Sequence, residues 1–282
     1  MTFSLVLVNA EDYWLDYFAE YDVQRVRLQT SRWMLREGQL WIFDSALGKG
    51  VRADALFWRI GPVRPFPNHR AALELVRYAQ IPCINPAETL LKGLDRLSML
   101  NDLRAIGLPV VPFTAIAGSP LLSQLPPQVP SVIKVGTYHA GYGKMKLTSL
   151  EQWQDMADFI FITEDYLTIE SYIDYVRDIR CVAVGEQVWA LARQGSRWKA
   201  NAGVVDTQLI AAPPLLYEYT LRAMRAFGAD VLALDFLEKQ DGRYVVLESN
   251  DVPGLTGFPE IVNETLAERM KAKIRQAQAS SE

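Results

Sequence analysis

Residues 130–147 read Pro-Ser-Val-Ile-Lys-Val-Gly-Thr-Tyr-His-Ala-Gly-Tyr-Gly-Lys-Met-Lys-Leu, a glycine-rich loop with lysines on both sides between two apolar runs. The apolar flanks favour strands, and Gly136, Gly141 and Gly143 allow the backbone conformations of a tight loop. The stretch therefore predicts a β-hairpin in which backbone amides and Lys134 or Lys144 can meet an anion. A plain surface turn would have the same composition, so this stretch alone leaves both interpretations open.

The same stretch does not fit a Walker-type phosphate loop, whose spacing is G-x-x-x-x-G-K-[ST]. When Gly143 and Lys144 are placed on that pattern, Tyr138 stands where the first glycine belongs and Met145 where Ser or Thr belongs. We therefore exclude the Walker class, and the rest of the chain must decide what the hairpin does.

The composition is that of an ordinary globular chain. Its 282 residues are 50% hydrophobic and 22% charged, enough for two or three subdomains with their own cores. The 29 basic and 33 acidic residues give a net charge of -4, which argues against nucleic acid or a membrane surface as the partner. No apolar run approaches the ~20 residues that span a bilayer, and we expect no signal peptide. Cys83 and Cys181 lie in apolar surroundings, so we expect free buried thiols and a cytoplasmic protein.

The first 86 residues alternate short apolar runs with helical patterns. Strands are predicted at 3–8, 23–28, 40–43, 55–60 and 81–85, and a helix at 69–80. This alternation predicts an α/β opening domain that ends near residue 86. One long helix is expected over 87–106 before Gly107, then an extended run at 109–116 and a connection at 118–130.

The second half predicts a mainly antiparallel sheet. Helices are expected at 150–161, 214–227 and 260–276, and strands at 166–173, 179–184, 186–192, 231–238 and 244–248. Two of the connections are short turns, at Gly185 and at 239–242, so the strands beside them should form hairpins.

Three polar residues interrupt the last predicted hairpin. Asp235 lies inside an apolar strand, while Glu248 and Asn250 end the partner strand. Carboxylate and amide oxygens are ligands that Mg²⁺ prefers, so their convergence would make a metal site. Alternatively, Glu248 and Asn250 merely open the turn at 251–254. A turn does not explain Asp235, which lies inside the strand. Burying an unpaired carboxylate there would cost free energy, so Asp235 needs a partner.

In this order the motifs resemble an ATP-grasp domain. Similarity to the ligase family that adds glutamate to ribosomal proteins is carried by Arg59-Ile-Gly-Pro62, Ile169-Glu-Ser-Tyr-Ile-Asp174, Asp178-Ile-Arg180, Val245-Val-Leu-Glu-Ser-Asn250 and Val252-Pro-Gly254. The hairpin from Lys134 to Lys144 and the stretch from Arg193 to Gly203, with Trp198-Lys-Ala-Asn201, resemble synapsin instead. The resemblance covers roughly residues 55–260. It implies an α/β (α+β) ATP-grasp fold with an N-terminal α/β domain at 1–86, a central subdomain with the glycine-rich lid at 87–172 and a C-terminal subdomain with the metal site at 173–282.

The resemblance also implies a role for each matching residue. Nucleotide binding falls to Arg96, Lys134, Gly141, Gly143, Lys144, Glu170, Ser171, Tyr172, Ile173 and Asp174. Catalysis falls to Arg180, Arg193 and Asn201, Mg²⁺ or Mn²⁺ binding to Asp235, Glu248 and Asn250, and substrate binding to Arg59. One position departs from the family: its first phosphate-contacting lysine, in an Asp-Lys pair, falls at Asp95-Arg96. Arginine keeps the charge there but changes the geometry.

The function that the resemblance implies is an ATP-dependent carboxylate–amine ligase, which forms an amide or peptide bond through an acyl phosphate and releases ADP and phosphate. Its expected partners are small-molecule or peptide carboxylates and amines, with homo-oligomers left open. The alternative is a synapsin-like regulatory module that binds ATP without ligase turnover. Glu248 and Asn250 favour catalysis, because synapsin departs from the ligase pattern at this strand end.

Overall fold

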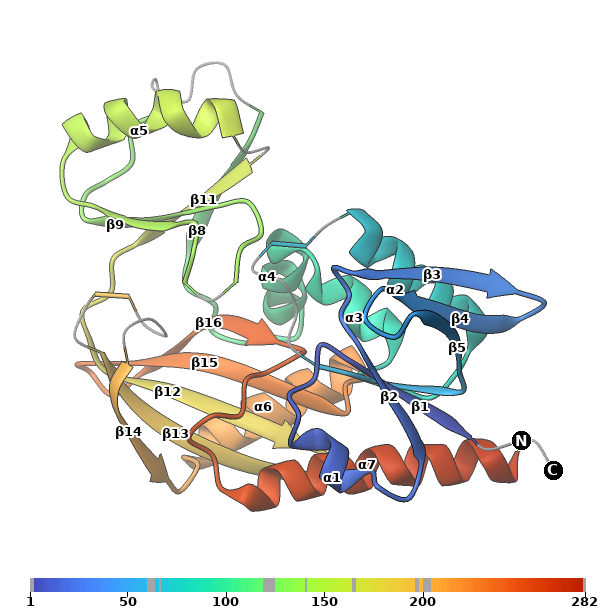
Figure 1. Cartoon of the computed structure of the whole chain (residues 1–282). Helices are drawn as coiled ribbons and strands as arrows, with labels where there is room; N and C mark the ends of the chain where they lie inside the picture. The colour runs from blue at the N-terminus through green and yellow to red at the C-terminus, as the bar shows by residue number, and fades with distance from the viewer. Residues whose placement is uncertain are drawn as a thin grey trace.

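The computed structural model describes residues 3–59, 64–65, 67–118, 125–139, 141–163, 166–195, 198–199 and 204–280. Within these residues the strands form one parallel and three antiparallel sheets (Figure 1). The central sheet and its helix stand apart from the rest of the molecule, whereas the other sheets lie close together. The predicted α/β (α+β) fold class is confirmed.

The N-terminal part is built on a parallel sheet in the order β2 (Asp22–Val26), β1 (Ser4–Val8), β6 (Ala55–Trp58) and β7 (Cys83–Ile84). Every residue of β1 and β6 is buried, as continuous apolar runs predict for central parallel strands. The short helix α1 (Trp14–Tyr17) follows β1, and α2 (Pro67–Ala79) precedes β7. The predicted α/β alternation is therefore confirmed here.

A separate antiparallel sheet lies between β2 and β6, where the sequence predicted a single strand at 40–43. It consists of β3 (Ser31–Arg36), β4 (Gln39–Asp44) and β5 (Lys49–Ala53). Its apolar face packs with α2 through Leu40, Ile42 and Val51. Burial alternates with a period of two along β3 and β4, but apolar residues follow one another in both strands, so polarity in the sequence did not mark them as half-buried strands.

The prediction of one long helix over 87–106 was wrong, because the structure has two helices, α3 (Ala87–Gly93) and α4 (Arg96–Ala105). Asp95 between them has an extended backbone, with φ -125° and ψ 127°, and its carboxylate accepts a 2.8 Å hydrogen bond from the Ser98 amide. This is the geometry of an N-terminal helix cap. The break makes Arg96 the first residue of α4, which packs on the C-terminal sheet through Met99, Leu100 and Leu103.

The central sheet has the order β10 (Lys144–Leu147), β9 (Ser131–Val135), β11 (Tyr166–Ser171) and β8 (Phe113–Ala117), with all neighbours antiparallel. Helix α5 (Leu150–Thr163) covers one face, where Ile133, Leu167 and Trp153 share a small core. The predicted glycine-rich hairpin is confirmed as β9–β10. The face of the sheet away from α5 carries Lys134 and faces the C-terminal part of the molecule.

The C-terminal sheet has the order β14 (Val204–Ile210), β13 (Gln187–Gly195), β12 (Tyr175–Val184), β15 (Val231–Lys239) and β16 (Tyr244–Asn250). Both predicted hairpins are present, and all neighbours are antiparallel. Helices α6 (Pro214–Phe227) and α7 (Glu260–Ala279) cover opposite faces. Alternate residues of β12 therefore meet different helices: Cys181 lies in the core with α6 and Val182 in the core with α7.

The N-terminal and C-terminal sheets are joined through a shared core and one buried amide. Helix α7 packs against both, so that Leu7, Phe57 and Met270 belong to one apolar cluster. The Asn85 side chain donates to the carbonyls of Val231 (2.7 Å) and Asp251 (2.5 Å), and its oxygen accepts from the Val231 amide (2.9 Å). The buried amide is thus satisfied across the junction between the two sheets.

Cys83 and Cys181 are buried free thiols, as predicted, and burial raises the pKa of each to about 12. Among the helices of the described ranges, none combines the length and the apolar character that a membrane crossing requires.

Candidate active site

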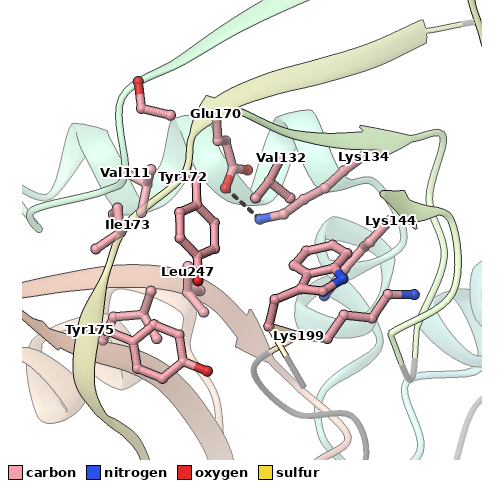
Figure 2. A pocket seen from close by; sticks show the side chains of 13 residues that line it. Val111, Val132, Lys134, Lys144, Glu170, Tyr172, Ile173, Tyr175, Lys199 and Leu247 are labelled. Atoms are coloured by element: carbon pink, nitrogen blue, oxygen red, sulfur yellow. Dashed lines mark hydrogen bonds and ion pairs between the residues drawn. The ribbon is translucent and has the colours of Figure 1, made fainter. Parts of the chain in front are cut away.

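A pocket opens between the central and C-terminal sheets, at the strands that carry the predicted nucleotide and metal residues (Figure 2). Its cavity measures about 50 Å³. The lining residues come from both sheets, from the connection between β11 and β12 and from the segment at 198–199: Val111, Val132, Lys134, Lys144, Glu170, Ser171, Tyr172, Ile173, Tyr175, Trp198, Lys199, Leu237 and Leu247.

The hairpin register places two lysines side by side in this pocket. Lys134 on β9 pairs directly with Lys144 on β10. Like charges at directly opposite positions of a sheet are destabilising, so this pair needs anions nearby. Glu170 on β11 accepts a 2.5 Å bond from Lys134 Nζ, and Glu248 on β16 accepts a 3.2 Å bond from Lys144 Nζ (Figure 2 shows the Lys134–Glu170 bond). Burial, and then the nearby Arg96 guanidinium, lower the pKa of Lys134 to about 7.

Arg96 bridges the two glutamates. Its Nη2 lies 3.2 Å from Glu170 Oε1, and its Nη1 lies 3.3 Å from Glu248 Oε2. We name these five side chains (Arg96, Lys134, Lys144, Glu170 and Glu248) the lysine cluster. It contains three cations and two carboxylates, all buried or nearly so. Such an excess of buried positive charge favours an anionic ligand.

A second ion cluster lies on the C-terminal sheet. Asp235 is fully buried and accepts two 2.8 Å bonds from Arg180, through Nε and Nη2, the bidentate geometry typical of strong arginine–carboxylate pairs. Arg193 Nη2 donates to Asp235 at 2.9 Å and to Asp178 at 2.7 Å. We name Asp178, Arg180, Arg193 and Asp235 the arginine cluster. Burial raises the pKa of Asp235, but the two arginines outweigh burial and lower that pKa overall.

The three predicted metal ligands lie together on the β15–β16 hairpin. Asp235 pairs with Glu248 in the register, and Asn250 Nδ2 donates to Asp235 Oδ2 at 3.3 Å. Two carboxylates and an amide oxygen fit the chemistry that Mg²⁺ prefers, although both oxygens of Asp235 already accept bonds from arginines. In the part of the chain that the structure describes, no three His, Cys, Asp or Glu side chains group as a metal site, so phosphate or water oxygens would have to complete the coordination.

The connection between β11 and β12, predicted to bind the nucleotide, lies along the pocket wall. Ser171, Tyr172 and Ile173 line the cavity, whereas Asp174 is exposed and outside its lining. The Glu170 side chain points to Lys134 and Arg96 rather than along the connection.

The apolar part of the wall was not predicted from the sequence: Val111, Val132, Tyr175, Leu237 and Leu247. A signal was present for Val132, because residues two apart on a strand share a face and Lys134 was already assigned to the pocket. The other four come from strands and connections whose relative position the sequence does not reveal.

Gly141 and Gly143, the predicted lid residues, lie at the tip of the β9–β10 hairpin, both with positive φ. A side chain on Gly143 would come within 2.9 Å of the Tyr138 ring and 3.1 Å of the Val135 carbonyl, so the tight turn requires glycine there. Lys199 Nζ donates to the Gly141 carbonyl at 3.2 Å, and this contact joins the lid to the segment that carries Trp198. Asn201 lies outside the described residues.

Arg59 lies at the end of β6 but points inward. The residue is only 1% exposed, its Nη2 donates to the Pro253 carbonyl at 3.0 Å, and its guanidinium lies 5.1 Å from the Trp14 ring centroid. Burial lowers its pKa. Arg59 is thus in contact with the segment that follows β16, and its role in substrate binding stays a prediction.

Residues 99–273, more than half of the chain, match the family described as the synapsin ATP-binding domain. Among curated proteins, a glutamate–LysW ligase of Sulfolobus acidocaldarius is 26% identical over 257 residues, covering 83% of this chain and 84% of the relative. A probable α-L-glutamate ligase of Citrobacter koseri is 27% identical over 228 residues, covering 77% of this chain and 75% of the relative.

Solved structures show the same fold. D-alanyl-alanine synthetase A of Vibrio cholerae superposes with a TM-score of 0.75 at 14% identity and covers 98% of both chains. The macrocyclase MdnC of Microcystis aeruginosa, bound with its precursor peptide MdnA, superposes with a TM-score of 0.68 at 16% identity and covers 95% of this chain and 99% of its own. The predicted ATP-grasp fold is confirmed. The chain belongs to the family of the synapsin ATP-binding domain, within the ATP-grasp superfamily.

Proposed function

We propose that this protein uses ATP and Mg²⁺ to activate a carboxylate as an acyl phosphate, and that an amine then displaces the phosphate to form an amide bond between glutamate and a peptide or protein. The predicted class, an ATP-dependent ligase that forms carbon–nitrogen bonds, is confirmed by the curated relatives. The same relatives give no support to the alternative of a regulatory module without turnover. Glutamate is proposed because both curated relatives are named for it.

The observation that carries the proposal is the lysine cluster at the wall of a partly apolar pocket. Tyr172, Ile173 and Leu247 offer an apolar surface of the kind that accepts a planar base, while Lys134 and Lys144 offer charge a short distance away. A nucleotide needs both surfaces in this arrangement. Phosphate oxygens would accept the bonds that the lysines now donate to glutamates.

Mg²⁺ would be held by Glu248 and Asn250, with Asp235 behind them, and would neutralise charge on the phosphoryl group as it is transferred. The remaining work falls to side chains of this chain. Lys134 and Lys144 orient the phosphates, and Arg180 and Arg193, held in place by Asp235, stabilise negative charge on the activated carboxylate. The lid excludes water, which protects an acyl phosphate from hydrolysis.

Turnover with labelled substrates tests the proposal. The protein is incubated with ATP, Mg²⁺, glutamate and pools of peptides, and ADP, phosphate and product masses are recorded. Oxygen-18 placed in the substrate carboxylate that is activated should appear in the released phosphate. When the amine displaces phosphate from the acyl phosphate, one oxygen of that carboxylate leaves with the phosphate. ADP release that needs no carboxylate, or product without label transfer, would contradict the mechanism. Glu248→Gln serves as the inactive control.

A further inference from the structure

We infer that Arg96 is a positioning residue that keeps Glu248 paired in the nucleotide-free protein, so that a divalent metal does not bind at Glu248 before the nucleotide does. The inference rests on the proposed metal site and concerns the position where an arginine replaces the lysine of the family pattern.

The position of Arg96 is fixed at the start of α4. Its side chain is 6% exposed and reaches Glu170 on the central sheet and Glu248 on the C-terminal sheet. Its backbone amide donates to Thr137 Oγ1 at 3.3 Å, and the capping carboxylate of Asp95 holds the helix start. The planar fork of arginine can hold two carboxylates at once, which the point charge of a lysine does less well.

Glu248 is already satisfied by cations in this structure. Its Oε2 lies 3.3 Å from Arg96 Nη1 and 3.2 Å from Lys144 Nζ, and its side chain is 15% exposed. A metal ion that approached this carboxylate alone would have to displace at least one of two cations in a site where solvent screens charge weakly.

A nucleotide removes this obstacle because its phosphates offer the Arg96 guanidinium another anionic partner. Arg96 can then leave Glu248 without leaving its own charge unpaired, while its Nη2 stays beside Glu170, whose other partner, Lys134, turns to the phosphates. Release of Glu248 and delivery of the metal therefore occur together. Loss of Arg96 should free Glu248 in part without a nucleotide, while each glutamate keeps one lysine, so the variant should fold.

Direct binding of Mn²⁺ without a nucleotide tests the inference. Free Mn²⁺ is measured by electron paramagnetic resonance for the wild type, Arg96→Met, Arg96→Lys and the control Arg104→Met, an exposed position on the same helix. We expect one additional Mn²⁺ in Arg96→Met, bound about 10- to 100-fold more tightly than at any site in the wild type, with a smaller gain in Arg96→Lys. Adding Glu248→Gln to Arg96→Met should abolish the gain. Equal Mn²⁺ binding by wild type and Arg96→Met would overturn the inference, as would an equal gain in Arg104→Met.

A second series with ADP present separates this inference from the proposed function. If the wild type binds Mn²⁺ with ADP and Glu248→Gln does not, the proposed metal site is correct. An absent gain in nucleotide-free Arg96→Met would then refute the role of Arg96 alone. If no protein binds Mn²⁺ even with ADP, the metal site itself is wrong, and the inference fails with it.

Discussion

The lysine cluster and the arginine cluster are both buried and lie next to each other, yet they are built differently. In the arginine cluster, two arginines meet two aspartates at 2.7–2.9 Å within a single sheet. In the lysine cluster, three cations meet two glutamates, and three of its four contacts are 3.2–3.3 Å long. The lysine cluster also joins two sheets, because Lys144 of the central sheet contacts Glu248 of the C-terminal sheet and Arg96 contacts a glutamate of each.

The difference separates a structural function from a binding function. Balanced charges with short contacts on paired strands hold each other in one geometry, so Arg180 and Arg193 are oriented before any substrate arrives. In the lysine cluster the two glutamates do not fully neutralise the three cations, and the contacts are longer. An anion that enters can form the ion pairs that the glutamates leave unmade. We therefore expect changes in the arginine cluster to affect folding first and changes in the lysine cluster to affect ligand binding first.

The largest effect is expected for Asp235→Asn. The change leaves two buried arginines without their common anion, and we expect the free energy of unfolding to fall by about 3–5 kcal/mol. Urea denaturation measures it. Asp241→Asn, in the exposed turn of the same hairpin, is the control and should change stability little. Equal stability of Asp235→Asn and wild type would remove the distinction between the clusters.

Glu248→Gln should separate activity from stability. Turnover should fall about 10²- to 10³-fold, because the proposed metal ligand is lost from the phosphoryl-transfer site. The free energy of unfolding should fall by only about 1 kcal/mol, since Arg96 still has Glu170 as an ion-pair partner. ADP release and urea denaturation measure the two quantities. Full Mg²⁺-dependent turnover in a folded Glu248→Gln protein would make us withdraw the metal assignment.

Lys134→Ala should weaken ATP binding by about 10- to 100-fold, because the phosphates lose a charge-assisted partner on β9. Calorimetric titration of the folded variant with ATP measures the loss. Lys49→Ala, an exposed lysine on β5, is the matched control and should bind ATP like the wild type. Unchanged ATP affinity in Lys134→Ala would place the phosphates elsewhere.

Arg59→Lys should raise the KM of the acid substrate about tenfold, because the change keeps the charge and loses the bidentate fork. ATP affinity should stay nearly unchanged, since Arg59 contacts Pro253 and not the nucleotide pocket. Steady-state kinetics with the acid, once it is identified, measure both. The exposed Arg32→Lys is the control. If Arg59→Lys and the wild type had the same kcat and the same KM for the acid, recognition of the acid would fall to Arg180, Arg193 and Asn201.

The smallest effect is a dependence of ATP binding on pH. Lys134 has a pKa of about 7 in the free protein, well below its ordinary 10.5, so most of it is neutral at pH 8. Bound phosphates favour the charged form, so ATP binding should take up a proton and weaken about fivefold from pH 7 to pH 8. Calorimetry in buffers of different ionisation enthalpy measures the uptake. Lys134→Met should abolish it, and equal uptake by that variant would assign the proton to another group.

Elements with strong local signals could be predicted from the sequence. Helix α6 has the predicted bounds because Pro214 begins it and Gly228, with φ +65°, ends it. The hairpin turn at Gly185 was found for a similar reason, since its φ of +58° favours glycine. The break before Arg96 was missed because helical periodicity continues through it. Gly93 and Asp95 were the signals of the break, because glycine disfavours a helix interior and aspartate is a preferred N-cap residue.

The composition of the site was predictable, but its connections were not. Lys134, Lys144, Glu170 and Glu248 were each chosen from a local motif and resemblance. That one arginine contacts both glutamates depends on how two sheets face each other, which no local pattern encodes. The inward direction of Arg59 likewise follows from the packing of β6 against Trp14 and Pro253, from parts of the chain far away in sequence.

The buried amide of Asn85 bears on how the enzyme opens. Because the hydrogen bonds of Asn85 and the core around α7 join the first and last parts of the chain, we expect these parts to move together as one jaw, with the central sheet and α5 as the other. The chain crosses between the jaws beside Val111, which is bonded to the edge of β16, and again between β11 and β12. The nucleotide pocket lies between the two jaws, so we expect movement at these two crossings to change its width as ATP enters and as the products leave.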